Sequence, residues 1–599
     1  MTLTSSLCQS AQSAPRQIPT AERRTTRRNC AVDLLIIALL WCASLAVVNP
    51  RGDFPLNDDW IYGRTVKGFM ATGHYLPPGH EVTLITNVLW GSLFCIPAGF
   101  SFNALRLSTL VLSLLGIFGT YFLARELRAQ RWSAVVAALV LGFNPIYYAL
   151  SNTFMTDVPC TAIAVIAALF LVRNLRNGSD RDLFVGTVLV VAATLSRQIA
   201  IAVPVAFAFA LVLRRGITTR SILRAAIPTA LSLGALFAYK QWFGARGPME
   251  SYRTGELLHA LASPGTLLRS LALGTYQDLF YLGWFLMPVL ILAMTSIVPS
   301  HRKKALAIII ASIVALAAVM GRHMYTGQNV LMPLSGNVIV RSGIGPLTLR
   351  DAFVLHLSRL PAMPVGFWLA VTVVSLAGAA LLAGAAGVGV ADAAPRLRPG
   401  KLGDSEAART FLLLSVVVYL LPCFITRFCD RYLIFVVPLL AASIASIPSA
   451  SPGFSRATKA VSRLAALALL VASGLFAILG TRDYLAWNRI RWEALHDLVE
   501  SGSAKAEEID GGYAFNGLYL YDSSYPDTPG KSWWWVRGDK YQIAFGDVPG
   551  YRAIKEYSYN HWMPPHVGKV VVLQRDAQAP GKECTDPSSL SGRPWQRSK

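Results

Sequence analysis

Charged residues are scarce in this sequence. Of its 599 residues only 15% are Asp, Glu, Lys or Arg, against about 25% in a typical soluble domain, and 54% are hydrophobic. This balance excludes a soluble enzyme, a disordered chain and a disulfide-rich scaffold. Several apolar runs approach the ~20 residues that cross a hydrocarbon core of about 30 Å, so the sequence predicts an all-α polytopic membrane protein.

Familiar catalytic and binding motifs are also missing. The eight cysteines are scattered and form no CxxC pair, so neither a zinc site nor a disulfide framework is predicted. The chain has no phosphate-binding P-loop and no HExxH pair. Nucleotide and zinc-hydrolase chemistry therefore have no support in the sequence.

Acidic residues are few, with 33 Asp and Glu against 55 Lys and Arg, which gives a net charge of +22. In a soluble protein such an excess would suggest a nucleic-acid partner. Residues 481–599, however, hold 15 residues of each sign, so the excess lies in the apolar part of the chain. There it reports the orientation of membrane loops, and no nucleic-acid partner is predicted.

Thirteen apolar runs predict membrane-spanning helices. They lie at about 31–49, 102–124, 133–150, 158–171, 183–195, 199–213, 222–239, 274–297, 305–320, 364–388, 410–425, 432–447 and 461–480. With residues 1–30 as a cytoplasmic tail before a retained signal-anchor, the inner loops hold 25 Lys and Arg and the outer loops 13, as the positive-inside rule requires. This orientation of the thirteen spans, the topology frame, requires a break between two spans at residues 196–198. It also requires residues 82–100 to lie at the outer membrane interface.

The same frame places residues 481–599 outside the cytoplasm as a small α/β domain. RIRWEALHDLVESG predicts a helix, whereas GGYAFNGLYLY and GKVVVLQR predict strands. The aromatic residues of GGYAFNGLYLY and SWWWVRGDKYQ either form the core of this domain or stack on sugars. We expect a multi-pass protein of the inner (cytoplasmic) membrane, with residues 31–480 surrounded by lipid.

Ionisable residues outside the cytoplasmic loops gather toward one membrane face. Arg106 and Asp278 lie near the outer ends of their spans, and the outer loops add Asp58, Asp59, Glu81, Asp157, Arg197, Arg427 and Arg431. A proton or ion pathway would place charge near the membrane midplane, where each charge costs ~2.5–3.5 kcal/mol. The observed pattern instead predicts a site at the outer surface.

The first outer loop, residues 50–101, carries paired carboxylates. It contains FPLNDDWIYGRTVKGFMATG, in which Asn57, Asp58 and Asp59 precede an amphipathic helix. Either these side chains cap that helix, or one carboxylate is a general base at the membrane surface. Asp58 is the candidate base, and Asp59 fits a cap or a supporting group better than a second base.

Five segments between residues 31 and 450 share a family pattern. They are Asp58-Asp59-x-x-Tyr62 with Met70, Thr72-Gly73 and Pro77; FNALRLSTLVLSLLGIFGTYFLARELR with Arg106; FMTDVP with Asp157; TLSRQIAIAVPV with Arg197; and DRYLIFVVPLLAA with Tyr432. Together they resemble the membrane (GT-C) glycosyltransferases that use lipid-linked sugars. That superfamily includes protein O-mannosyltransferases, lipid A aminoarabinose transferases and RgtA/B/C/D-like transferases. Two features depart from the pattern, because Arg197 replaces a usual lysine and PGHEVTLITN has Glu81 but no lysine.

The resemblance implies a GT-C fold and transfer of a sugar from a polyprenyl-phosphate donor to a hydroxyl of a glycan, lipid or protein acceptor. It implies catalytic carboxylates at Asp58 and Asp157, with Asp59, Tyr62, Glu81 and Arg106 as further candidates. Arg197, Arg427, Arg431 and Tyr432 would bind the donor phosphate, because a departing anion calls for cations rather than an acid. The arginines could equally snorkel to lipid phosphates, and Asp157 could cap its helix, hold a basic partner or assist a divalent metal.

Two other functions stay open on the sequence alone. A lipid or sugar transporter or flippase would be expected to show an internal repeat and midplane charge, and neither is present. A non-catalytic protein of envelope assembly would keep the fold without the reaction, which the Asp58 motif argues against. For the transferase, a single displacement predicts inversion at the anomeric carbon.

Overall fold

The computed structural model describes residues 20–77, 83–244, 258, 260–300, 302–357, 360–393, 397–425, 428–447, 455–522, 524–525 and 534–576. The chain divides into two compact units, each described by itself. The membrane unit comprises residues 1–53, 62–346 and 362–485. The C-terminal unit comprises residues 54–61, 347–361 and 486–599.

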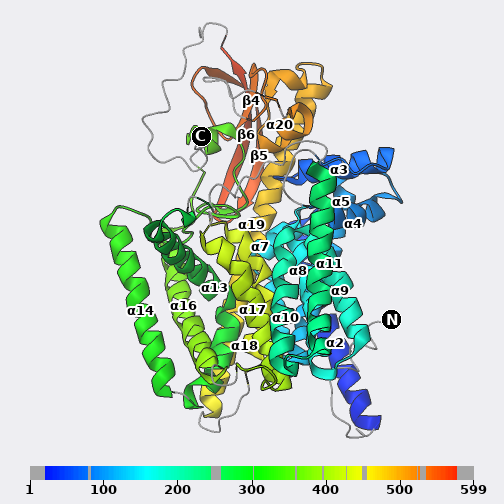
Figure 1. The fold of residues 1–599 in the computed structure, drawn as a ribbon. Helices are drawn as coiled ribbons and strands as arrows, with labels where there is room; N and C mark the ends of the chain where they lie inside the picture. The colour runs from blue at the N-terminus through cyan, green and yellow to red at the C-terminus, as the bar shows by residue number, and fades with distance from the viewer. Residues whose placement is uncertain are drawn as a thin grey trace. The chain divides into compact units, whose positions relative to one another are not determined.

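The membrane unit is built from apolar helices (Figure 1). They are α2 (Thr20–Val48), α4 (Ile85–Cys95), α5 (Phe102–Glu126), α6 (Arg131–Gly142), α7 (Pro145–Ser151), α8 (Asp157–Asn177), α9 (Asp180–Ser196), η1 (Gln198–Ile201), α10 (Ala202–Arg215), α11 (Thr219–Gly244), α13 (Pro264–Ser300), α14 (Arg302–Tyr325), α16 (Val365–Ala393), α17 (Asp404–Ile425), η3 (Asp430–Phe435) and α18 (Val437–Ala445), with the short strands β1 (Ile339–Val340) and β2 (Gly343–Ile344). Two further helices, α3 (Asp59–Thr72) and α19 (Arg456–Glu500), contribute residues to both units.

The predicted spans are helical, and the fold class is confirmed. Ten helices among the described residues are long and apolar enough to cross a membrane, and the bent pair α6–α7 would make eleven. The predicted count of thirteen is not reached by this measure. The reason is length, because α9 has 17 residues and α18 has nine, fewer than the ~20 of a full span. The chain is a multi-pass membrane protein.

The apolar run at 183–213 is broken where the charge pattern predicts a break. α9 ends at Ser196, and Arg197 adopts an extended backbone (φ −148°, ψ 126°) before η1 begins. The chain then doubles back. A Cβ placed on Gly178, just before α9, would lie 3.2 Å from the guanidinium group of Arg215, the last residue of α10. The start of α9 and the end of α10 therefore lie on the same side of the unit.

Small residues bring the helix backbones of the membrane unit into contact. A Cβ on Gly116 of α5 would lie 2.9 Å from the Cβ of Ala162 in α8. A Cβ on Gly283 of α13 would lie 2.4 Å from the backbone nitrogen of Ala379 in α16. Lipid supplies no hydrophobic drive between helices, so close packing of this kind holds them together. α8 is thus packed against α5 and α9, and α10 against α17 (Figure 1).

The C-terminal unit holds a four-stranded sheet of order β3-β4-β6-β5. Its elements are α15 (Arg350–Phe353), η4 (Ala506–Glu508), β3 (Ile509–Asp510), α20 (Tyr513–Leu520), β4 (Tyr541–Ala544), β5 (Tyr551–Trp562) and β6 (Pro565–Arg575). β3 pairs with β4 in parallel, and the other pairs are antiparallel. A buried cluster of Ala544, Val548, Val571 and Leu573 packs against Leu355, so the segment 347–361 helps to close the core.

One prediction for this unit was wrong, and two are confirmed. GKVVVLQR forms β6 as predicted. GGYAFNGLYLY does not form a strand, because its residues 513–520 are α20, in which Phe515 and Tyr519 contact each other at the four-residue spacing of a helix. RIRWEALHDLVESG is helical as predicted, and its residues 489–500 form the last part of the 45-residue α19, which also contains the last predicted span.

Candidate functional site

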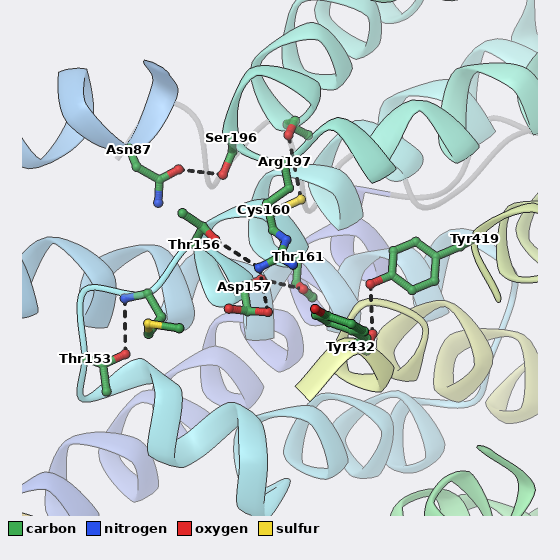
Figure 2. Close-up of polar contacts among 12 residues, drawn as sticks. Asn87, Thr153, Thr156, Asp157, Cys160, Thr161, Ser196, Arg197, Tyr419 and Tyr432 are labelled. Atoms are coloured by element: carbon green, nitrogen blue, oxygen red, sulfur yellow. Dashed lines mark hydrogen bonds and ion pairs between the residues drawn. The ribbon is translucent and has the colours of Figure 1, made fainter. Parts of the chain in front are cut away.

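The first group of predicted site residues forms a cluster in the membrane unit. We call Asp157, Arg197, Arg431 and Tyr432 the Arg197 cluster; Figure 2 shows three of them converging. Nη1 of Arg197 donates to Oδ1 of Asp157 at 2.9 Å and to Oγ1 of Thr156 at 3.0 Å. The side chains of Arg197 and Asp157 are only 16% and 3% exposed. The structure therefore shows the basic partner that was one of the alternatives for Asp157.

Tyr432 provides an aromatic surface beneath both arginines. The guanidinium carbons of Arg197 and Arg431 lie 5.4 Å and 5.8 Å from the centre of its ring. The hydroxyl of Tyr419 donates to the carbonyl oxygen of Tyr432 at 3.0 Å and so fixes this part of the chain (Figure 2). A ring face attracts cations, and sharing one ring offsets part of the repulsion between two arginines.

Helix starts position these residues. α8 begins at Asp157 and has Pro159 in its first turn, α10 has Pro204 in its first turn, and α18 has Pro438 at its start. Proline fits there because the first N–H groups of a helix have no partner within the helix. The Asp157 carboxylate also lies at the partly positive N-terminal end of α8.

The Arg197 cluster carries more positive than negative charge, because two guanidinium groups accompany one carboxylate. Asp430 precedes Arg431, but its buried carboxylate accepts hydrogen bonds from the backbone N–H groups of Val338 and Ile339 at 3.1 Å and 2.9 Å. The Oδ2 atom of Asp157 is buried and accepts no hydrogen bond within the described part of the chain. Chemically, the cluster can bind an anion and accept a hydrogen bond from a ligand hydroxyl.

Asp58 belongs to the C-terminal unit. Its Oδ1 atom accepts a hydrogen bond of 2.9 Å from the hydroxyl of Tyr513, the first residue of α20. The buried ring of Trp60 lies beside Tyr513, Tyr521 and Trp535, with centroid separations of 6.1, 5.2 and 5.1 Å. Asp58 itself is half-buried. Its carboxylate is therefore held by a residue that is distant in sequence and remains partly accessible.

Asp59 has a local structural role. It is the first residue of α3, is 1% exposed and accepts a hydrogen bond from the backbone N–H of Leu56 at 3.2 Å. The intervening Asn57 has φ +51°, a left-handed conformation that asparagine tolerates. α3 is the helix predicted after these residues, and it ends before Gly73, whose φ of +71° is typical of a helix C-terminus.

The remaining candidates are dispersed. Tyr62 is buried in α3. Arg106 is buried in α5, where Nη1 donates to the carbonyl oxygens of Pro50 and Gly52 at 2.6 Å and 2.9 Å and ties the chain after α2 to α5. Glu81 and Arg427 lie outside the described residues. Within the described ranges, no group of three or more His, Cys, Asp or Glu side chains is placed to hold a metal ion.

Three residues of these sites escaped the sequence analysis. Tyr513 lies in a segment assigned to a strand, and Tyr419 lies inside an apolar run where a tyrosine is unremarkable. Thr156 lies within FMTDVP, where a threonine is equally unremarkable. The hydroxyl partners of Tyr513 and Thr156 lie 455 and 41 residues away in the sequence, and that of Tyr419 lies 13 residues away, so no local pattern marks these hydroxyls.

Comparison with known proteins supports the resemblance over part of the chain. A family model described as dolichyl-phosphate-mannose-protein mannosyltransferase matches residues 88–242, which contain Asp157 and Arg197 but not Asp58 or Tyr432. A search of curated proteins finds no match.

Among solved structures, the chain is similar to ArnT from Cupriavidus metallidurans bound to undecaprenyl phosphate, with 12% identity over 80% of this chain and 79% of ArnT and a TM-score of 0.36. It is also similar to the apo state of that ArnT, with 15% identity over 81% and 83% of the two chains and a TM-score of 0.32. The family match supports a membrane glycosyltransferase, and it confirms, over residues 88–242, the resemblance to the glycosyltransferases of lipid-linked sugars.

Proposed function

We propose that this protein moves a sugar from a polyprenyl-phosphate donor to an acceptor hydroxyl at the outer face of the inner membrane. The observation that carries the proposal is the Arg197 cluster. A largely buried arginine, held by Asp157 at a break between two apolar helices, lies within the segment that the family model matches. Two arginines over one tyrosine ring at such a break suit a lipid phosphate.

The cluster suits the departing half of the donor. As the bond between the anomeric carbon and the phosphate oxygen breaks, the electron pair stays on the phosphate, and charge-assisted hydrogen bonds stabilise it. Asp157 engages Nη1 of Arg197, which leaves Nε and Nη2 to bind phosphate oxygens. Arg431 and Tyr432 would complete this phosphate site, with Arg427 assigned to it from the sequence. The second oxygen of Asp157 would accept a hydrogen bond from a sugar hydroxyl.

Asp58 suits the acceptor half of the reaction. A general base must take the acceptor proton while the acceptor oxygen bonds to the anomeric carbon. Asp58 offers a partly accessible carboxylate with one oxygen already held by Tyr513. A single displacement of this kind inverts the anomeric configuration. The roles of Asp58 and of the Arg197 cluster are assigned separately, each from the chemistry of its own unit.

The test compares Asp58→Asn with Asp59→Asn. Strains lacking the gene and complemented with each variant are analysed by lipid and glycan mass spectrometry, which also names the missing sugar and acceptor. Asp58→Asn should lower transfer by about 10²–10⁴-fold, because asparagine can still accept the Tyr513 hydrogen bond but cannot take the proton. Asp59→Asn should be milder. Normal glycans with Asp58→Asn at normal protein levels would overturn the proposal, and a greater loss with Asp59→Asn would move the base to Asp59.

A further inference from the structure

Tyr513, the first residue of α20, donates a side-chain hydrogen bond to the proposed base, Asp58. We infer that Tyr513 is a positioning residue, whose hydroxyl holds the Asp58 carboxylate in the orientation that accepts the acceptor proton. This rests on the proposed function, because it concerns the residue proposed as base. It also gives the C-terminal unit a part in the reaction.

The hydrogen bond gives the two carboxylate oxygens of Asp58 different roles. Oδ1 of Asp58 receives the Tyr513 hydroxyl at 2.9 Å, within the range of a strong hydrogen bond to a carboxylate. With Oδ1 held, Oδ2 is directed consistently, and proton transfer depends on such geometry before it depends on basicity.

Tyr513 is itself firmly held. Its ring lies 4.3 Å from that of Trp534 and 6.1 Å from that of Trp60 between ring centroids. Its backbone N–H donates to the carbonyl of Thr348 at 3.0 Å. The preceding Gly512 has φ +83°, and a Cβ there would lie 2.6 Å from the same carbonyl oxygen. Only glycine permits this close approach, so the start of α20 is anchored to the segment 347–361.

The loop that carries Asp58 is held on both sides of the carboxylate. A Cβ on Gly517 of α20 would lie 2.2 Å from the Trp60 ring, so Trp60 packs directly on the helix backbone. Before Asp58, Phe54 stacks on Trp492 of α19 with a centroid separation of 6.2 Å. A cap for α3 needs only local contacts, whereas these contacts all come from the C-terminal part of the chain.

A purely structural role for Tyr513 makes a different prediction. If only the ring matters, phenylalanine should serve equally well. If the hydroxyl acts on Asp58, its removal takes away a hydrogen bond that orients the carboxylate. The saturating rate should then fall about tenfold through loss of orientation, while the half-saturating amount of donor and the melting temperature stay unchanged.

The experiment uses the full-length protein in nanodiscs. The donor is the polyprenyl-phosphate lipid fraction extracted from the deletion strain, and the acceptor is the envelope of that strain. Tyr513→Phe keeps the ring contacts, and Tyr519→Phe on the same helix, 53% exposed, is the matched control. We expect Tyr513→Phe to lower the saturating rate about tenfold without changing the half-saturating amount of donor or the melting temperature. Tyr519→Phe should match the unsubstituted protein.

The outcomes separate this inference from the proposed function. A normal saturating rate with Tyr513→Phe, or a rate that falls together with the melting temperature, would overturn the positioning role. If Asp58→Asn is inactive in the same assay, the proposed base survives that result. If Asp58→Asn is active, the proposed function itself fails, whatever Tyr513→Phe does.

Discussion

Replacing Arg197 tests the Arg197 cluster both as structure and as donor site. In Arg197→Ala, the Asp157 carboxylate, 3% exposed, loses the partner of Oδ1, while Oδ2 has no partner among the described residues. Removing one member of a buried ion pair costs about 3–5 kcal/mol because the other charge is stranded, and the 16% exposure of Arg197 favours the lower end, about 3 kcal/mol. Arg197→Ala combined with Asp157→Asn removes the stranded charge and should recover part of the loss.

Arg197→Lys should behave differently. An ammonium group can replace Nη1, which donates to both Thr156 and Asp157, and lysine is the residue usual at this position in the proteins that the sequence resembles. We therefore expect partial transfer activity with Arg197→Lys. Arg197→Ala should raise the half-saturating donor amount and lower the saturating rate together, as expected when a phosphate contact that strengthens during reaction is lost.

The assays are thermal unfolding and donor titration of purified protein. A thiol-reactive dye reports unfolding, because Cys160 is buried beside the pair and reacts only when the unit opens. The expected order of melting temperatures is unsubstituted protein, double variant, Arg197→Ala. A normal melting temperature and normal donor titration for Arg197→Ala would show that this arginine only snorkels, and the phosphate role would then pass to Arg427 or Arg431. If the double variant melts no higher than Arg197→Ala, the stranded charge of Asp157 is not the cause of the lost stability.

Two further predictions concern stability and topology. Burial raises the pKa of Asp351, whose carboxylate accepts the backbone N–H of Phe545 at 2.9 Å, to about 6. The folded state thus holds this proton more tightly than the unfolded chain does, so the free energy of unfolding should fall by up to ~3 kcal/mol as pH rises from about 4 to about 6 and then level off. Melting temperatures of the full-length protein should show this slope, and Asp351→Asn should flatten it; equal slopes would contradict the assignment. For topology, alkaline phosphatase fused after Lys599 should be active and β-galactosidase inactive, because the Lys and Arg count of 25 against 13 predicts a C-terminus outside the cytoplasm. The reverse result would invalidate that frame.

The sequence alone determined the features that depend on local composition. The hydrophobic runs marked the helices of the membrane unit, because apolar length is what a bilayer demands of a segment. Ser196–Gln198 marked the break between α9 and α10, because the arginine-rich segments on either side had to share a membrane face. The motif around Asp58 predicted the helix α3, and GKVVVLQR predicted β6, through their own periodicity.

Only the tertiary structure decided which side chains meet. Asp157 and Arg197 are 40 residues apart and Asp58 and Tyr513 are 455 apart, and neither pairing leaves a trace in the residues nearby. The helix α20 was mistaken for a strand because short aromatic segments fit either structure until packing chooses, and here Gly517 against Trp60 and Tyr513 against Asp58 favour the helix. A local sequence pattern indicates whether a segment suits lipid or water. A functional site depends instead on groups distant in sequence, which only the folded chain brings within hydrogen-bond distance.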